Sequence, residues 1–344
     1  MIHFVGDINL TDGFFDTGIG VGSKIDNGIN PFESFDRQNG DIWIGNLECV
    51  ISDVSIKTGL YKEQFRISPS RLKSLQHFNI YGFANNHAMQ HGAEAYQETL
   101  IYLNRLGVKC VGTNVYRTLT FEHCNKTVSI LAFSQRKEKY ASLTEYWYSP
   151  EYKDIESEFQ KISNSDYKIA YIHWGIEFMN KPYVDQKQFA HWLIDLGFDL
   201  IIGMHAHVLQ GFEIYKGKRI YYSLGNFVFN MSYTPTKYSI ILNLDVESTV
   251  LKLTHICVYI DDNGFPKIIE EDDVPPAFRF EYLNTLLKIE EDNETYYADA
   301  AKALGRYRMS NRLNFLKNIF KIKLKIWVKI LIDFIQRRHF SYKK

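Results

Sequence analysis

The chain has 344 residues, which is too long for one small domain and about right for one large α/β domain with appendages. Its apolar content of 45% is typical of a globular protein with a hydrophobic core. The 40 basic residues balance the 40 acidic ones, so the composition gives no sign of a general attraction to nucleic acid, and we expect no nucleic-acid partner.

The four cysteines form no C-x-x-C pair, which excludes a zinc ribbon or a thioredoxin-type motif. The first residues, "MIHFVGDINL", lack the basic start and the long apolar core of a signal peptide. No stretch reaches the ~18 uninterrupted apolar residues that span a bilayer. These features predict reduced thiols and a cytoplasmic protein.

Short apolar runs that end in a glycine or a polar turn recur along the chain and predict β-strands. They are "IHFVGD" from residue 2, "DIWIGNLE" from 41, "FNIYGFANNH" from 78, "GVKCVGT" from 107, "TVSILAFS" from 127, "YKIAYIHWG" from 167, "FDLIIGMH" from 198, "KRIYYSLGN" from 218, "YSIILNLDV" from 238 and "KLTHICVYI" from 252. Apolar residues at helical spacing predict helices in "PSRLKSLQHF" from 69, "GAEAYQETLIYLNRLG" from 92 and "DQKQFAHWLIDLG" from 185. The alternation predicts parallel strands with helices packed outside, and the later strands, joined by short turns, predict a second, more antiparallel sheet.

Three regions differ in composition. Residues 1–261 carry the strand and helix pattern, residues 262–309 combine turn signals with one or two helices, and residues 310–344 are strongly basic. Within 313–335 a basic amphipathic helix is predicted, because four lysines recur every four positions beside apolar and aromatic residues. The lysines are Lys317, Lys321, Lys325 and Lys329. Such a helix suits an anionic membrane surface, and the alternative is a helix packed on its own domain or on a partner subunit.

Polar side chains follow several predicted strands where they end, and in α/β sheets functional groups gather at the carboxyl ends of strands. The set comprises Asp7, Glu48, Asn86, His87, His173 with Glu177 after it, His205 and His207. Carboxylates, imidazoles and an asparagine suit a divalent metal of the zinc, manganese or iron kind, held as one ion or two. Such a metal could polarise a phosphoryl oxygen and activate water.

Two further residues are candidates for the site. Asn226 ends the run "KRIYYSLGN", although a turn of this kind is often only structural. Arg66, in "EQFRIS", can bind a phosphate or carboxylate through two parallel hydrogen bonds.

The motifs "VGDINL", "GNLECVI", "FANNHAMQHG", "YIHWGIEF" and "GMHAHVLQGFEIYKGKRIYYSLGNFVF" occur in this order over about residues 1–260. In this combination the chain resembles the CapA family of poly-γ-glutamate or capsule biosynthesis proteins, which are related to calcineurin-like metallophosphatases. The resemblance implies a four-layer α/β/β/α sandwich with a metallophosphatase-like centre at the strand ends.

The resemblance also implies roles for single residues. Asp7 and His207 would bind a first metal, Glu48 would bridge two metals, and Asn86, His173 and His205 would bind the second. His87 would protonate the leaving oxygen or stabilise the charge of the transition state, with Asn226, Arg66 and Glu177 as further members of the catalytic site.

Four positions depart from the related patterns. Asn9 stands where the phosphatases have a histidine, and Glu48 replaces their bridging aspartate, which weakens the first metal position. Gln90 and Met204 replace a common aspartate and a frequent histidine of the capsule family. Loss of that aspartate removes an orienting partner of His87, and the neighbouring His91 is the candidate to replace it.

The resemblance leads us to expect a metal-dependent hydrolase or transferase that acts on a phosphate ester or an amide in a polyanionic cell-envelope polymer or its precursor. The alternative is a non-catalytic binding or assembly component of a membrane-associated polymer synthase or export complex. In both cases we expect a cytoplasmic protein bound peripherally at the inner face of the membrane, and the sequence leaves its oligomeric state open.

Overall fold

A computed structural model of the chain describes residues 1–35, 37–136, 138–247, 251–322, 324, 326–328 and 332. The strands are β1 (Ile2–Ile8), β2 (Ile42–Leu47), β3 (Val50–Ile51), β4 (Arg66–Ile67), β5 (Ile80–Gly82), β6 (Lys109–Val111), β7 (Thr118–His123), β8 (Lys126–Ser134), β9 (Tyr167–His173), β10 (Leu200–Met204), β11 (Phe212–Tyr215), β12 (Lys218–Tyr221), β13 (Asn226–Val228), β14 (Tyr238–Asp245), β15 (Lys252–Ile260) and β16 (Pro266–Ile268). The α-helices are α1 (Val21–Asp26), α2 (Ala93–Arg105), α3 (Tyr152–Ile162), α4 (Val184–Leu196), α5 (Phe280–Leu286) and α6 (Asn293–Asn318). Short 3-10 helices are η1 (Phe14–Asp16), η2 (Gly59–Lys62), η3 (Pro69–Leu75), η4 (Thr234–Lys237), η5 (Glu271–Asp273), η6 (Pro276–Phe278) and η7 (Ile319–Lys321).

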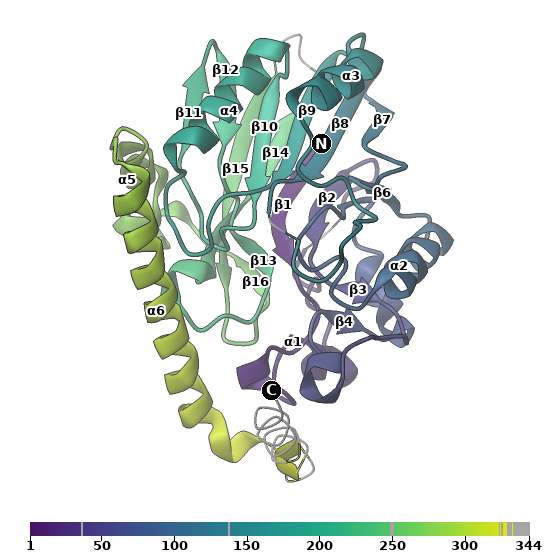
Figure 1. The fold of residues 1–344 in the computed structure, drawn as a ribbon, viewed down its shortest axis with the longest axis vertical. Helices are drawn as coiled ribbons and strands as arrows, with labels where there is room; N and C mark the ends of the chain where they lie inside the picture. Colours follow the sequence, from purple (N-terminus) through teal and green to yellow (C-terminus); the bar gives the residue numbers. More distant parts are fainter. Residues whose placement is uncertain are drawn as a thin grey trace.

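Two large sheets carry the fold (Figure 1). The eight-stranded sheet has the order β16-β15-β14-β1-β2-β5-β6, and β13 also pairs with β1. Its β1, β2, β5 and β6 are parallel, whereas β14, β15 and β16 join antiparallel. The six-stranded sheet has the order β11-β12-β10-β9-β8-β7, with a parallel centre and antiparallel edges. The predicted parallel pairing is thus present in both sheets, but the expectation that the later strands form a second, more antiparallel sheet is wrong, because β14 pairs with β1 and so adds β14, β15 and β16 to the first sheet.

Three apolar layers show how the sheets stack. The central layer takes side chains from both sheets, such as Phe4 and Ile44 from one and Ile130 and Ile202 from the other. The outer face of the eight-stranded sheet is covered by α2, and the outer face of the six-stranded sheet by α3 and α4. The order helix, sheet, sheet, helix confirms the expected four-layer α/β/β/α sandwich.

Two helices differ from the sequence prediction. The segment predicted as a helix from residue 69 forms the 3-10 helix η3, whose seven residues are fewer than the ~12 that make an α-helix stable without strong packing. The structure also contains helix α3, which is not among the helices predicted from the sequence, although its Ile155, Phe159 and Ile162 have helical spacing and are buried.

The C-terminal region is continuous with the rest of the molecule. Strand β16 pairs with β15, so the segment from 262 begins inside the main sheet. Helix α6 passes residue 310 without a break, and after η7 the backbone becomes extended at Ile322 (φ −76°, ψ 122°). Helix α6 thus crosses the predicted domain boundary at 310, and the extended backbone at Ile322 interrupts the helix predicted over 313–335, while Lys325 and Lys329 lie outside the described residues. The division into domains stays a prediction. Among the described residues, no helix combines the length and the apolar character needed to cross a lipid bilayer.

Strand β1 is flanked closely by the turn before β13. The N–H of Asp7 donates to the carbonyl oxygen of Gly225 (3.1 Å), and Asp7 is in register with Asn226. A Cβ at Gly6 would lie 1.8 Å from that same carbonyl oxygen. Only glycine at position 6 lets strand β1 and the turn before β13 approach this closely.

We expect Gly6→Ala to lower the free energy of unfolding by about 1–3 kcal/mol or more, because the backbone must shift to accommodate the new methyl group. Gly305→Ala is the control, because Gly305 lies in α6 with nothing within 4 Å of the added Cβ, and there alanine should raise the free energy of unfolding by up to ~1 kcal/mol. Denaturant unfolding of both variants measures the difference. Equal effects at the two positions would contradict the close approach at Gly6.

Candidate metal centre

Six of the predicted metal-binding side chains converge at the carboxyl ends of strands. The eight-stranded sheet supplies Asp7 at the end of β1, Glu48 after β2 and Asn86 in the loop after β5. The six-stranded sheet supplies His173 at the end of β9 and His205 and His207 in the loop after β10. All six are buried. The ends of two packed sheets thus form one polar cluster inside an otherwise apolar interior.

Asp7 is held by donors on both carboxylate oxygens. Asn46 Nδ2 donates to Oδ1 (2.8 Å), the backbone N–H of His205 donates to Oδ2 (3.1 Å), and Nδ1 of His207 lies 3.4 Å from Oδ2. Burial alone would raise the pKa of Asp7, but the hydrogen bond and the charge of His207 outweigh it and hold the pKa below the ordinary value. Asp7 is therefore a fixed, ionised carboxylate.

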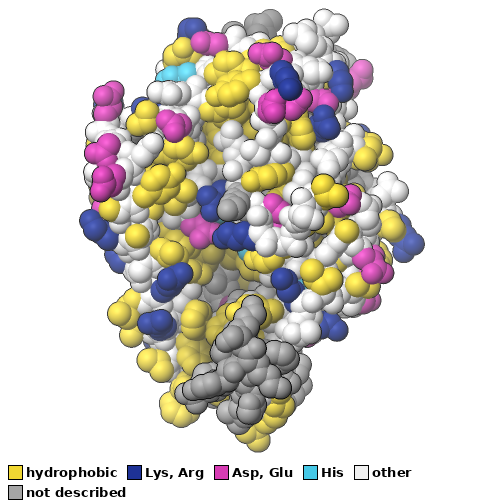
Figure 2. Space-filling view, viewed as in Figure 1, with side chains coloured by type: hydrophobic (Ala, Val, Ile, Leu, Met, Phe, Trp, Pro, Cys, Tyr) yellow, Lys and Arg dark blue, Asp and Glu magenta, His cyan; other side chains and the backbone are white. Residues whose placement is uncertain are grey.

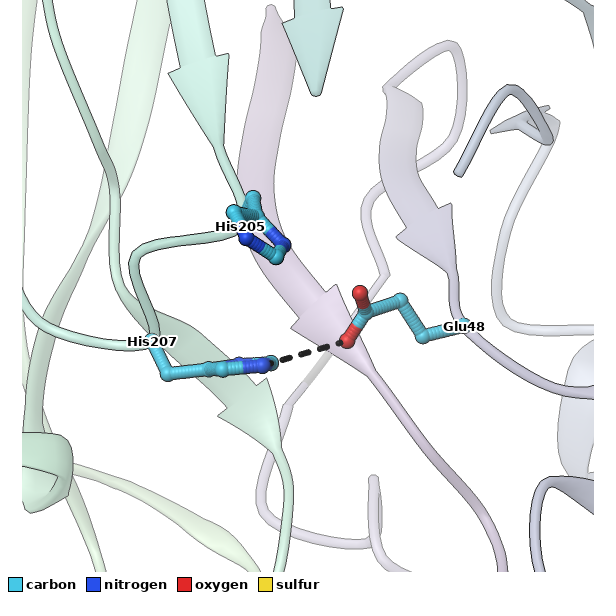
Figure 3. A group of neighbouring side chains, drawn as sticks. All are labelled: Glu48, His205 and His207. Atoms are coloured by element: carbon cyan, nitrogen blue, oxygen red, sulfur yellow. Dashed lines mark ion pairs between the residues drawn. The ribbon is translucent and has the colours of Figure 1, made fainter. Parts of the chain in front are cut away.

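The side chain of Glu48 has close contacts but, among the described residues, no hydrogen bonds. Its Oε1 lies 3.2 Å from Nε2 of His173, and its Oε2 lies 3.9 Å from Nε2 of His207, as Figure 3 shows for the second pair. Neither oxygen accepts a hydrogen bond, although both are buried. Burial, and next the charge of Asp7, raise the pKa of Glu48 to about 8. A buried carboxylate without donors is costly unless a cation compensates it.

His205 and His207 lie on the left-handed side of the backbone map, with φ of 93° and 59°. The loop is therefore not extended at these two residues. Positive φ is unfavourable for residues with a Cβ and concentrates at functional sites. Here the conformation directs both imidazoles toward Glu48 (Figure 3).

The three histidines have different partners. His207 Nδ1 donates to Oδ1 of Asn226 (2.9 Å), which leaves Nε2 facing Glu48. His173 Nε2 lies 2.7 Å from Oδ1 of Asn86 and 3.0 Å from Nδ1 of His205. The Nε2 of His205 is buried and has no hydrogen-bond partner.

Two overlapping groups of side chains can each hold a metal ion. One is Glu48, His205 and His207, and the other is Asp7, Glu48 and His173; within each, the ligand atoms lie within 4.8 Å of one another. Glu48 belongs to both groups, as a bridging carboxylate would. The resemblance had placed His173 with His205 and had placed His207 with Asp7, so the distances divide the histidines differently. Mixed imidazole and carboxylate donors fit zinc, manganese or iron better than a site made of oxygen alone.

The electrostatics of the cluster favour a cation. Burial lowers the pKa of His173 to about 3, and burial followed by the charge of His173 lowers the pKa of His205. Burial would also lower the pKa of His207, but the charge of Glu48 and the hydrogen bond to Asp7 raise it to about 10. Of the three, only His207 favours its charged form. Two buried carboxylates therefore attract positive charge to the same point.

His87 is positioned from two sides. Its ring stacks on Phe65, with centroids 3.6 Å apart and planes 2° apart, and its Nδ1 lies 2.7 Å from Oε1 of Gln90. Because an amide oxygen can only accept, Nδ1 carries the proton in this contact and Nε2 is left to exchange one. Gln90 therefore takes over the orienting role that the missing aspartate left open.

The other side chains at or near positions that differ from the family patterns contact neighbouring residues. His91 does not support His87, because its Nε2 contacts the carbonyl oxygen of Gln64 (2.7 Å) and its Nδ1 contacts Oγ of Ser55 (2.7 Å). The Oδ1 of Asn9 accepts hydrogen bonds from the N–H and the hydroxyl of Thr11. Met204 is buried in the central apolar layer. These side chains serve the local structure around the centre.

The predicted catalytic residues divide among three places. Glu177 lines the cavity beside His87 and His207. Asn226 lies behind His207 as its hydrogen-bond partner. Arg66 is not brought to the cluster, because its guanidinium donates to the carbonyl oxygens of Lys62 (2.8 Å) and Ser52 (2.6 Å) and borders a different cavity.

Asparagines at the strand ends support the ligands, although the motifs above assign them no role. Asn46 joins Asp7 to His173, with its Nδ2 3.2 Å from Nδ1 of His173. Asn85 Nδ2 donates to Oδ1 of Asn46 (3.3 Å) and to the carbonyl oxygen of Leu47 (2.8 Å). Their position directly beside Glu48 and Asn86 in the motifs was the available signal.

One ligand of the cluster, His207, lines a cavity of about 350 Å³. One wall carries His87, Glu177 and His207, and another carries residues of α6. The size is within the range of small-molecule sites. A reacting group placed in this cavity lies next to His207 and His87, and His207 faces Glu48 on its other side.

Comparison with known proteins identifies related sequences. The family model for the bacterial capsule synthesis protein PGA_cap matches residues 1–231. The capsule biosynthesis protein CapA of Bacillus anthracis is 30% identical over 206 residues, which cover 55% of this chain and 49% of that protein. The PGA biosynthesis protein CapA of Bacillus subtilis (strain 168) is 32% identical over 172 residues, which cover 47% of this chain and 45% of that protein. The matches thus span about half the length of these relatives.

Solved structures are similar at a lower level. A putative 5'-nucleotidase from Staphylococcus aureus matches with a TM-score of 0.45 and 14% identity, over 83% of this chain and 57% of that one. A 5'-nucleotidase from Candida albicans SC5314 matches with a TM-score of 0.43 and 13% identity, over 90% of this chain and 58% of that one.

We expect Asn226→Ala to weaken binding of Mn²⁺ or Zn²⁺ by about 10–100-fold, because His207 loses the acceptor that fixes its ring. Asn226→Asp keeps an acceptor oxygen and should retain most of the affinity. Calorimetric titration of the metal-free protein measures both, and Asn104→Ala, at an exposed position on α2, is the control. Equal affinities for Asn226→Ala and the control would show that Asn226 does not position a ligand.

Proposed function

The chain belongs to the PGA_cap family of bacterial capsule synthesis proteins, and from this premise we propose that it is a metal-dependent hydrolase or transferase. Its substrate would be a phosphate ester or an amide in a polyanionic cell-envelope polymer or its precursor. The observation that carries the proposal is the buried cluster at the strand ends, in which both oxygens of Glu48 and Nε2 of His205 have no hydrogen-bond partner. Buried carboxylate and imidazole atoms that lack hydrogen-bond partners are best explained by a bound cation.

Asp7, Glu48, Asn86, His173, His205 and His207 would hold one or two divalent ions of manganese, zinc or iron. Bound there, such an ion would supply Lewis-acid chemistry, polarising a phosphoryl or carbonyl oxygen and lowering the pKa of water. The protein's own contribution is positional. Asn46 and Asn226 hold Asp7 and His207 in place, and the apolar surroundings exclude bulk water from the reacting group.

His87 is the proposed proton-transfer group. With Nδ1–H donating to Gln90, the proton exchanged is the one on Nε2. In the doubly protonated ring, Nε2–H gives its proton to a leaving oxygen or nitrogen, or hydrogen-bonds to the charge that develops there, whereas the neutral ring can only accept a proton at Nε2. Burial lowers the pKa of His87, so the doubly protonated form requires nearby negative charge such as that of Glu48. Glu177, on the same cavity wall, can accept a hydrogen bond from the substrate. Arg66 has no part in the proposal, because its donors are used by backbone carbonyls.

A second proposal concerns location and the non-catalytic alternative. Leu316 and Phe320 have exposed fractions of 60% and 98%, which supports contact with a lipid surface at the inner face of the membrane or with a partner in a polymer synthase complex. Lys317 and Lys321 line a cavity, so they are less available for a membrane than the expected lysine stripe required.

The first test is elemental analysis of the purified protein, followed by turnover of a generic phosphate ester and of a γ-linked glutamate amide. We expect about one or two metal ions per chain, and His205→Ala should lower turnover by roughly 100-fold or more, because it removes a ligand common to both reactions. Chelation should abolish turnover and added Mn²⁺ or Zn²⁺ should restore it. A protein that binds no metal, or one unaffected by His205→Ala, would exclude the enzymatic proposal.

A variant truncated after residue 322 distinguishes the enzymatic proposal from the proposal of an assembly component. The cavity walls end at Lys321, so a hydrolase should keep its turnover in solution, while binding to anionic vesicles should weaken because basic residues such as Lys325 and Lys329 are gone. Loss of polymer production in cells together with intact turnover of the purified protein would support a docking role for the tail. Loss of turnover in solution would contradict this division.

A further inference from the structure

Helix α6 is fastened to the body beside the metal centre. Tyr296, Ala300 and Ala303 of α6 are buried in a small apolar cluster with Phe178 and Phe229 of the body. Further along the helix, the ring of Tyr307 stacks on Phe178 at 4.1 Å between centroids. The helix is therefore a fixed wall beside the loops that carry Glu177 and His207.

Hydrogen bonds continue the attachment toward the end of the helix. Ser232 Oγ donates to Oδ1 of Asn311 (2.7 Å), and Ser310 Oγ donates to the carbonyl oxygen of Ser232 (3.0 Å). These polar contacts hold the helix without closing the space between it and the body. The result is a groove with a rigid outer wall.

The 350 Å³ cavity at the metal centre is completed by α6. Its lining includes Tyr307, Arg308, Asn311 and Asn314 on the helix, opposite His87 and His207. These helical residues lie beyond the family match, which ends at residue 231. The half of the cavity that faces away from the metal ligands is thus specific to the C-terminal part of this chain.

A second cavity, of about 560 Å³, adjoins the first along α6. The two share five lining residues, Asp16, Asn230, Met231, Ser232 and Asn314. Four lysines line the second cavity, namely Lys24, Lys237, Lys317 and Lys321. In Figure 2, Lys and Arg side chains border the hollow between α6 and the body.

The cations of this groove are only partly compensated. Lys237 forms an ion pair with Asp262, and burial, followed by the charge of Asp12, raises the pKa of Asp16 to about 7. Within the described part of the chain, no salt bridge involves Arg308, Lys317 or Lys321. Three cations of one helix that form no described salt bridge thus lie along two connected cavities, although the charge of Lys317 contributes, after Lys237, to lowering the pKa of Asp262. The first of these cavities is bordered by His207 of the metal centre.

We propose that α6 binds a linear polyanion, a chain of repeated carboxylate or phosphate groups, with Arg308 beside the reacting bond and Lys317 and Lys321 holding the units that extend into the second cavity. The position of the reacting bond rests on the proposed function, whereas the binding of the polyanion does not. Groups that bind remote parts of a chain hold its reacting part in place. The helix would thereby select long polyanions over small esters.

Binding of labelled polymer tests this without any need for turnover. The probes are poly-γ-glutamate, a short oligomer of it and inorganic polyphosphate, measured by fluorescence anisotropy with the full chain. Lys317→Gln/Lys321→Gln should weaken binding of the long carboxylate polymer by roughly threefold to tenfold and weaken the short oligomer less. Arg308→Gln should weaken both lengths. Higher salt should reduce these differences.

The matched control is Lys302→Gln/Arg312→Gln, which removes two charges from exposed positions on the same helix that line neither cavity. Equal losses for the control pair and the cavity pair would overturn the proposal, as would equal losses for long and short chains. Poly-γ-glutamate and polyphosphate distinguish a carboxylate polymer from a phosphate polymer by which one shows the greater loss. If the cavity pair weakens binding but no ester or amide is turned over, the inference stands and the enzymatic function falls.

Discussion

The structure depends on two carboxylates, Asp7 and Glu48, that are buried together between the sheets. Removing two like charges from water is unfavourable unless positive charge or hydrogen-bond donors replace the water. Asn46 and the backbone of His205 supply donors to Asp7, and His207 supplies a charge that both carboxylates share. The strained loop around His205 and His207 and the close approach at Gly6 serve this arrangement, because they bring donors from both sheets to one point.

Strand ends were the part of the site that could be predicted from sequence. A buried strand has a recognisable apolar run, and the first polar residues after it, such as Asp7, Glu48 and His173, must emerge at one edge of the sheet. What sequence could not supply was the direction of each side chain. The position of Asn226 behind His207 and the use of Arg66 by backbone carbonyls depend on loops whose paths no periodicity describes.

The C-terminal helix was the least predictable part. Its contact with the body uses small and aromatic residues, Ala300, Ala303 and Tyr296, and most of its surface is exposed, so the apolar spacing is weak. The lysine spacing instead suggested a separate helix farther along, whereas the backbone becomes extended at Ile322. A regular spacing of charges shows which residues would share a face of a helix, but it does not show where that helix begins or ends.

The division of the ligands between the two sheets has a mechanical consequence. Asp7, Glu48 and Asn86 belong to one sheet, and the three histidines belong to the other. An ion bound by both sets would cross-link the two sheets, which otherwise contact each other mainly through apolar side chains. Separation of the sheets would then require metal–ligand bonds to break. The metal-bound protein should therefore unfold far more slowly than the metal-free protein and resist proteases for longer.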